Sequence, residues 1–282
     1  ALGGNLSFNP LDDSLIGSDG KAFKLDAPES APDVPDNGFV DAVDVYLSPS
    51  ENPDAIQVLI DPNSERLQKL EPFGAWDGKD LNDLRVMIKA KGKCTTDHIS
   101  PAGPWLRLRG HLDKLSDNLL LGAVNAFNDQ VGQAKNMLSN EIEGCAQIAR
   151  QYKKQNISWV IVGDNNYGEG SSREHAAMTP RFLGCTTVIA KSFARIHETN
   201  LKKQGILALT FDNPDDYEKI HEDDQISISQ LDGLAPGKSV ECNILHADKT
   251  SEKIMLNHSY NDLQLEWFKA GSAMNFLRKK QN

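Results

Sequence analysis

The stretch Tyr167–Pro180, YGEGSSREHAAMTP, places small, polar and charged residues directly after the apolar run ISWVIVGD. Gly168 and Gly170 permit unusual backbone angles and the close approach of a ligand. A helix predicted to start near Ser172 would direct unpaired N–H groups at that turn, and Arg173 adds a forked donor suited to a carboxylate. The pattern predicts an anion site where a strand ends. The alternative is an ordinary glycine turn with a serine N-cap and a surface arginine.

A second polar segment, Lys91–Asp113, follows another predicted strand, and its prolines and glycines keep it out of regular structure. Such a loop costs stability unless its polar groups find partners. A turn hydrogen bond is the alternative explanation for Asp97 and His98, and a surface salt bridge is the alternative for Arg109. The residues of this segment that could do chemistry are Thr95, Thr96, Asp97, His98, Ser100, Arg107, Arg109 and His111.

Strands and helices alternate through the centre of the chain, which predicts an α/β fold with a mainly parallel sheet and right-handed crossovers. The predicted strands are 84–92, 157–163, 185–190 and 206–211, and the predicted helices are 141–154, 172–180 and 192–205. We expect Pro180 to end the second helix, Ser192 to cap the third and Gly205 to stop it. The expected buried faces carry Ile142, Ala146, Ala149 and Tyr152 on the first helix and Phe193, Ile196, Asn200 and Leu201 on the third.

The ends of the chain differ from its centre. Three further β runs, 224–229, 239–247 and 252–260, indicate an antiparallel addition to the sheet. Helical spacing then predicts a C-terminal helix packed on the core through Leu263, Trp267, Ala270, Met274 and Leu277. Residues 1–80 are rich in Pro, Asp and Ala without a sustained period. We expect them to form an extended linker or wrapping segment, or else a disordered leader, followed by one domain over 81–282.

Composition and charge exclude several classes of protein. The 282 residues, 39% hydrophobic and 25% charged, are typical of a globular protein. A net charge of −10 argues against non-specific binding of nucleic acid. The sequence contains no run of eighteen apolar residues and therefore predicts no membrane-spanning helix. The first ten residues lack the basic and apolar regions of a secretory signal and do not begin with methionine, so we expect a processed chain or a fragment.

The four cysteines, Cys94, Cys145, Cys185 and Cys242, are far apart and form no C-x-x-C pair. Their spacing argues against a self-contained zinc or iron–sulfur site. We expect free thiols in a reducing compartment.

Four segments resemble the C-terminal part of aconitases of the mitochondrial type. They are KGKCTTDHIS, GPW followed by RGHLD, NYGEGSSREHA and KSFARIHETNLKKQG. The resemblance runs from near residue 1 to the end of the chain. It implies a three-layer swivelling domain with a mainly parallel sheet, antiparallel additions and a C-terminal helix, preceded by an extended linker and located in the mitochondrial matrix. The small subunit of isopropylmalate dehydratase is more distant and shares only a version of the Ser-Ser-Arg-Glu-His loop.

Aconitases interconvert citrate and isocitrate through cis-aconitate, using a [4Fe–4S] cluster in which one iron binds the substrate. By resemblance, Ser171 is the base that takes the proton from carbon, and the cluster belongs to other domains, so this chain itself would bind no metal. The further matches are the substrate-binding Arg109, Ser172 and Arg173 and the site-lining Thr96, Asp97 and Ser100. His98 and His111 stand in matching motifs without an assigned role. We expect Arg109 and the loop 171–173 to converge at an open surface.

Three interpretations stay open from the sequence. The chain could be the terminal domain and linker of an aconitase, active only together with the cluster-bearing domains. It could be a separated aconitase-like domain that binds a tricarboxylate or has a structural role in a larger assembly, in which case the site would look the same. A small dehydratase subunit is least favoured, because the leader is long and the motifs are of the aconitase type.

Overall fold

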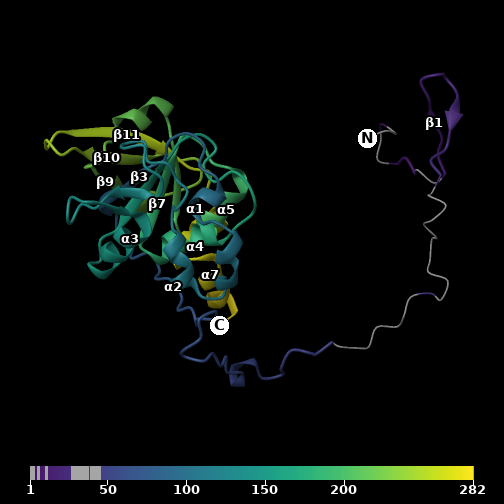
Figure 1. The fold of residues 1–282 in the computed structure, drawn as a ribbon, viewed down its shortest axis with the longest axis horizontal. Helices are drawn as coiled ribbons and strands as arrows, with labels where there is room; N and C mark the ends of the chain where they lie inside the picture. Colours follow the sequence, from purple (N-terminus) through teal and green to yellow (C-terminus); the bar gives the residue numbers. More distant parts are fainter. Residues whose placement is uncertain (1–3, 5–6, 10–11, 27–37, 39–45, 282) are drawn as a thin grey trace. The chain divides into compact units, whose positions relative to one another are not determined.

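The computed structural model describes residues 4, 7–9, 12–26, 38 and 46–281. They fall in two compact units, 1–58 and 59–282. The first unit contains an antiparallel hairpin of β1 (Leu15–Ile16) and β2 (Ala22–Phe23) and the 3-10 turn η1 (Pro53–Ala55) (Figure 1). Most of the Pro- and Asp-rich stretch that we expected to be extended lies outside the described residues, so the linker assignment stays a prediction.

The second unit is a mixed α/β fold built on a closed barrel of seven strands (Figure 1). Four strands run parallel: β3 (Leu81–Lys89), β6 (Trp159–Gly163), β7 (Cys185–Ala190) and β8 (Leu207–Phe211). The antiparallel strands are β9 (Gln225–Ser229), β10 (Val240–Leu245) and β11 (Ser251–Asn257). The parallel core with an antiparallel addition is as expected. The closure is not, because it depends on β9 pairing back onto β3.

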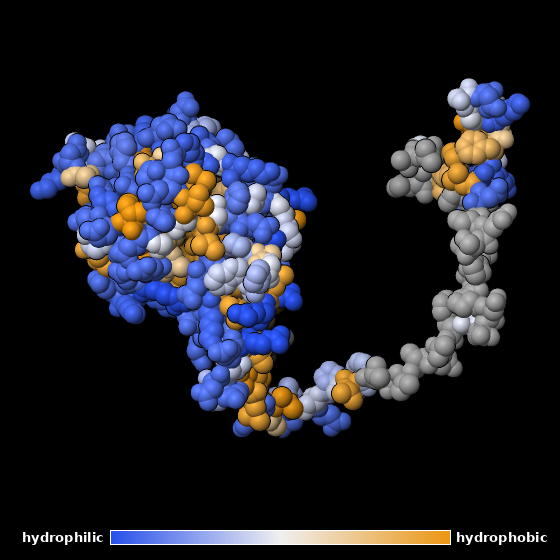
Figure 2. All heavy atoms as spheres, in the orientation of Figure 1, coloured by the Kyte–Doolittle hydropathy of each residue, from blue (hydrophilic) through white to orange (hydrophobic). Residues whose placement is uncertain are grey.

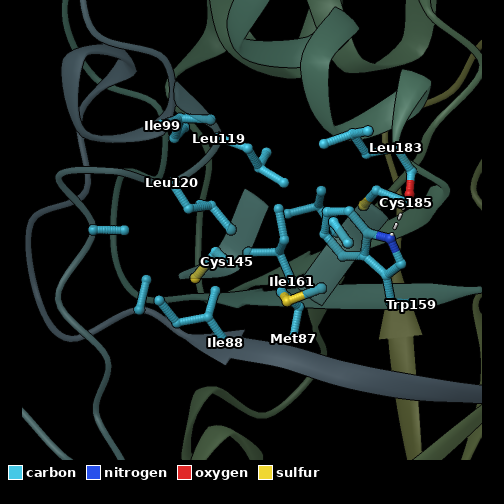
Figure 3. Packing of buried hydrophobic residues seen from close by; sticks show 14 of the residues in the cluster. Met87, Ile88, Ile99, Leu119, Leu120, Cys145, Trp159, Ile161, Leu183 and Cys185 are labelled. Carbon is cyan, nitrogen blue, oxygen red and sulfur yellow. Dashed lines mark hydrogen bonds between the residues drawn. The ribbon is translucent and has the colours of Figure 1, made fainter. Parts of the chain in front are cut away.

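Two hydrophobic cores lie on the two faces of the barrel sheet. One core lies between the sheet and the helices α3 (Cys145–Lys154), α4 (His175–Phe182) and α5 (Arg195–Lys203). Figure 3 shows Trp159 of β6 in this core, where its indole N–H donates to the Leu183 carbonyl at 2.9 Å. The other core contains alternate residues of the strands, such as Val160 and Val162, together with Phe268. The strands therefore bury both faces, and their near-continuous apolar runs follow from that.

The three central helices begin later than predicted. The predicted helix 141–154 starts at Cys145 because Ile142–Gly144 forms the short strand β5, and Ile142 is exposed. The helix predicted over 192–205 starts at Arg195, and the Ser192 hydroxyl accepts from the Asn166 N–H instead of capping it. Ile196, expected on the buried face, is 52% exposed. These errors lie in the first turn, where hydrophobic period gives little information.

Pro180 does not end the helix that contains it. The helix α4 continues to Phe182, and Pro180 is buried inside it. Proline removes one backbone hydrogen bond, and burial of its ring against the core offsets part of that loss.

The predicted C-terminal helix is two helices, α6 (Asp262–Ala270) and α7 (Ala273–Gln281). Gly271 separates them with a left-handed φ of 88°, a conformation that glycine adopts without strain. The predicted buried face was right at Ala270 and wrong at Leu263, Met274 and Leu277, which are exposed. The side chains that α6 buries are Leu265, Phe268 and Ala270.

Within the second unit, the segment 66–76, ahead of the first barrel strand, packs against the rest of the unit. Its Trp76 ring packs on Phe268 with centroids 5.5 Å apart, and its Gly74 carbonyl accepts from Arg181 at 3.0 Å. A β-bridge joins Leu67 to Gly110. The view in Figure 2 shows a mostly hydrophilic surface on this unit. None of the helices in the described part of the chain has the length and apolar character needed to cross a bilayer.

Candidate functional site

Three loops lie side by side where β3, β6 and β7 end. An isolated parallel bridge joins Thr95 to Glu169, and another joins Tyr167 to Phe193. The Tyr167 N–H also donates to the Ser192 carbonyl at 2.9 Å. The loop after β6 is therefore held between the other two, beyond the carboxyl ends of parallel strands where ligands commonly bind.

The loop after β6 brings Ser171 and Ser172 to the surface, where both are exposed. Gly168 and Gly170 turn the chain with φ values of 81° and 116°. The Thr96 hydroxyl donates to the Ser171 carbonyl at 3.0 Å and so fixes the backbone at that residue. No residue in the described ranges forms a hydrogen bond with the Ser171 side chain, so its hydroxyl is free to contact a ligand.

The helix after this loop starts at His175 rather than near Ser172. Its N-cap is Glu174, whose side chain makes no capping hydrogen bond. Two residues of loop separate Ser172 from the helix, and the field of a helix end decays within about one turn. The support that we expected the helix to give a negative charge at Ser171 is therefore weaker in this structure.

Arg173 is paired with Asp97 from the loop after β3. Both terminal nitrogens of the guanidinium donate to the Asp97 carboxylate, one of them at 2.9 Å, and one also donates to the Ser100 carbonyl at 3.4 Å. These hydrogen bonds from Arg173 hold the pKa of Asp97 below its ordinary value. Arg173 is thus already partnered by a carboxylate, so a bound anion would share it with Asp97.

Arg109 lies on the same hollow as Ser171, Ser172 and Arg173. The hollow has a volume of about 310 Å³ and is also lined by Ser100 and His175. The His175 ring lies 3.2 Å from the Arg109 carbonyl oxygen, which ties the two loops together. In the described part of the chain the Arg109 side chain has no carboxylate partner, so the proposed surface salt bridge is not present.

Thr96 and Ser100 are buried, each with 2% of its surface exposed. The Thr96 hydroxyl holds the Ser171 backbone, and the Ser100 hydroxyl donates to the Asn118 side-chain oxygen at 3.1 Å. Both residues lie at the site, where they hold its loops in place. His98 and His111 accept backbone hydrogen bonds at the starts of short helices, as part of a capping box and as a cap respectively.

A second hollow, of about 280 Å³, is also lined by Ser171 and Arg173. It is lined by His197 and Asn200 of α5, which sequence reasoning did not single out as site residues. His197 is 1% exposed, and neither ring nitrogen has a hydrogen-bond partner among the described residues. The sequence feature that could have marked His197 and Asn200 as site residues is their i, i+3 spacing on a helix opposite a glycine-rich turn.

Burial lowers the pKa of His197 to about 4. An unfolded histidine titrates near 6.5, so between about pH 6.5 and pH 4 the unfolded chain binds more protons than the folded chain. Stability due to His197 is therefore present at neutral pH and is lost as the pH falls through this window, by about 3 kcal/mol. We expect His197→Gln to remove this component, which urea unfolding of both proteins at about pH 7 and about pH 4 would measure. An equal pH dependence in the two proteins would contradict the prediction.

The four cysteines do not fit an iron–sulfur cluster within this chain. All four are buried free thiols, and burial raises the pKa of each to about 12. A cluster requires several thiolates that converge on one point. Across the described ranges, one group of at least three His, Cys, Asp or Glu side chains has its donor atoms close together, and it contains no cysteine.

Comparison with known proteins agrees with the sequence motifs. Residues 84–214 match the family model described as the aconitase C-terminal domain. The chain is 56% identical to mitochondrial aconitate hydratase of Gracilaria gracilis over 278 residues, covering 99% of this chain and 36% of that protein. It is 50% identical to mitochondrial aconitate hydratase of Saccharomyces cerevisiae, with the same coverage. The chain thus spans about a third of the length of these relatives.

A solved structure of 3-isopropylmalate dehydratase from Methanocaldococcus jannaschii is also similar, with a TM-score of 0.48 and 24% identity over 72% of this chain and 95% of that one. Residues 84–214 thus match the aconitase C-terminal domain family, within a chain that is similar over nearly its whole length to mitochondrial aconitate hydratases.

Proposed function

We propose that this chain forms one wall of the active site of an aconitate hydratase, which isomerises citrate to isocitrate through cis-aconitate by dehydration and rehydration. The observation that carries the proposal is the hollow shared by Ser171, Ser172, Arg173 and Arg109. These residues come from two loops more than sixty positions apart. Their meeting at one open hollow is what a tricarboxylate site on this chain requires.

Ser171 is the proposed base that removes the proton from the substrate carbon. A serine hydroxyl is a very weak acid, and lowering its pKa by ~5 units requires about 7 kcal/mol of preferential stabilisation of the alkoxide. The guanidinium groups of Arg109 and Arg173 are the cations that line its hollow. Exclusion of water from a closed site would strengthen their effect on the serine oxygen.

The two arginines are the proposed carboxylate ligands. Arg109 is free to form a bidentate pair with a substrate carboxylate. Arg173 also lines the hollow, and Asp97 holds its guanidinium in place while compensating its charge. Because the described residues offer one uncompensated guanidinium here, we expect the chain to bind citrate weakly without the rest of the enzyme.

The proposed partners of this chain are cluster-bearing domains and the substrates. Its cysteines do not fit a cluster, so we propose that the [4Fe–4S] cluster of the complete enzyme is held by cluster-bearing domains outside this sequence. The substrates would be citrate, cis-aconitate and isocitrate, and the location would be the mitochondrial matrix, as the names of the relatives indicate.

The test is reconstitution. The chain is mixed with a cluster-bearing aconitase that lacks its last domain, and turnover of citrate is measured by absorbance of cis-aconitate. Activity should appear only in the mixture. Arg109→Lys should lower kcat/KM about 10- to 100-fold, because loss of a charged bidentate hydrogen bond costs about 1.5–3 kcal/mol.

The matched control is Arg107→Lys, since Arg107 is exposed, lies two positions away and does not line the hollow. It should leave the rate unchanged. No activity in the mixture, together with sub-micromolar binding of citrate by the chain alone, would instead favour a separate tricarboxylate-binding domain.

A further inference from the structure

Three potential metal-ligating side chains meet where β9 begins and β10 ends. Antiparallel pairing places Leu245 opposite Gln225, so the next residues outward, His246 and Asp224, face each other across the two strands. His221 lies three residues before Asp224, just after η4 (Pro214–Lys219). The sheet register and this short connection therefore set the positions of all three residues.

The donor atoms form a compact triangle. His246 Nδ1 lies 2.9 Å from Asp224 Oδ1 and 3.3 Å from His221 Nδ1, and His221 Nδ1 lies 3.7 Å from Asp224 Oδ2. A zinc ion with tetrahedral bonds of about 2.0–2.1 Å holds its ligand atoms about 3.3–3.4 Å apart. The three separations bracket that value, although the two Asp224 distances are to different carboxylate oxygens. One donor atom from each residue lies within 4.8 Å of the other two, so one ion could contact all three side chains after small side-chain shifts.

The surroundings also suit a metal ligand set. The other ring nitrogen of His246, Nε2, lies 3.6 Å from the Glu252 carboxylate. At this distance the carboxylate forms no hydrogen bond with the ring, but its negative charge favours a proton on Nε2 and so leaves Nδ1 available to bind a metal. Asp224 is 1% exposed, and its Oδ2 accepts from the His221 N–H at 2.7 Å, which orients the carboxylate.

Within the described ranges, the side-chain partners of the buried Asp224 carboxylate are the two histidines. Asp224 forms ion pairs there with the two histidines and with no lysine or arginine. When the His246 Nδ1–H donates to Asp224, it is not directed at His221 Nδ1. The two imidazole nitrogens then face each other at 3.3 Å without a hydrogen bond between them. A metal ion would satisfy both nitrogens and the buried carboxylate at once.

We propose that His221, Asp224 and His246 bind a divalent transition-metal ion of the zinc type. Two imidazoles and one carboxylate form a donor set typical of zinc sites that keep a fourth position open, and the exposed side of His221 leaves room for water there. The ion would join the connection before β9 to the β10–β11 hairpin. None of the three ligands lines the hollows around Ser171, so this site is separate from the proposed catalytic function.

The experiment is titration of the metal-stripped, untagged 282-residue chain with Zn²⁺ alone by isothermal calorimetry. We expect one ion per chain. His221→Gln should weaken binding at least about tenfold, and because the His221 side chain is 68% exposed the variant should fold. The control is Asp248→Asn, which removes a nearby exposed charge that is not a donor of the triangle. It should change affinity by less than about threefold.

Cobalt provides a second readout. Co²⁺ bound to the wild-type chain should show visible absorption of tetrahedral intensity, and His221→Gln should lose it. The proposal is wrong if wild type and His221→Gln bind Zn²⁺ equally, or if Asp248→Asn weakens binding as much as His221→Gln does.

Discussion

In the reconstituted enzyme, Ser171→Ala should lower kcat for citrate about 10²- to 10⁴-fold, the usual contribution of a positioned general base. Ser171 lines the hollow with Arg109 and Arg173, and its hydroxyl has no competing partner in the described ranges. The substitution removes one oxygen from an exposed side chain, so the loop held by Thr96 should keep its conformation. KM should change little, because the base acts mainly in the transition state.

The control for this prediction is Ser251→Ala, at an exposed serine of β11 outside the hollow. It should retain the full rate in the same mixture. Urea unfolding of both variants would show whether a loss of rate reflects a loss of folded protein. Wild-type turnover by Ser171→Ala would refute the assignment of the base.

Gly168→Ala should destabilise the folded chain by about 2–5 kcal/mol, because two costs combine. Gly168 has a φ of 81°, where an L residue is strained, and a Cβ there would lie 2.1 Å from the ring of His197. His197 is buried and cannot move aside without opening its own packing. Urea or thermal unfolding measures the loss of stability.

Two further variants separate the costs. Gly237 has a φ of 74°, and a Cβ added there would have no atom within 4 Å, so Gly237→Ala should show only the backbone strain, about 1–2 kcal/mol. Adding His197→Ala to Gly168→Ala should recover about 1–3 kcal/mol relative to the sum of the two single changes. Strict additivity would mean that the ring of His197 does not press on the glycine.

The local sequence pattern predicted the strands well and predicted the ends and buried faces of the helices less well. The strand at 185–190 was predicted to the residue, because its mostly apolar run is bounded by Gly184 and Lys191 and almost all of its residues are buried. The helix before it was misplaced by three residues at its start, because Ser172 is a good cap by type but lies in a loop fixed by other contacts. Its end was misplaced because Pro180 is accommodated inside the helix.

The sequence by itself determined the order of strands and helices, the polar character of the loops that follow β3 and β6, and the family that their motifs resemble. Only the tertiary structure decided that Asp97 holds Arg173 across 76 positions, that His197 covers Gly168, and that β9 pairs with β3 to close the barrel. Hydrophobic period is a property of neighbouring residues and can be read along the chain. Strand register and side-chain packing across the fold join distant residues, and their energies depend on the whole arrangement.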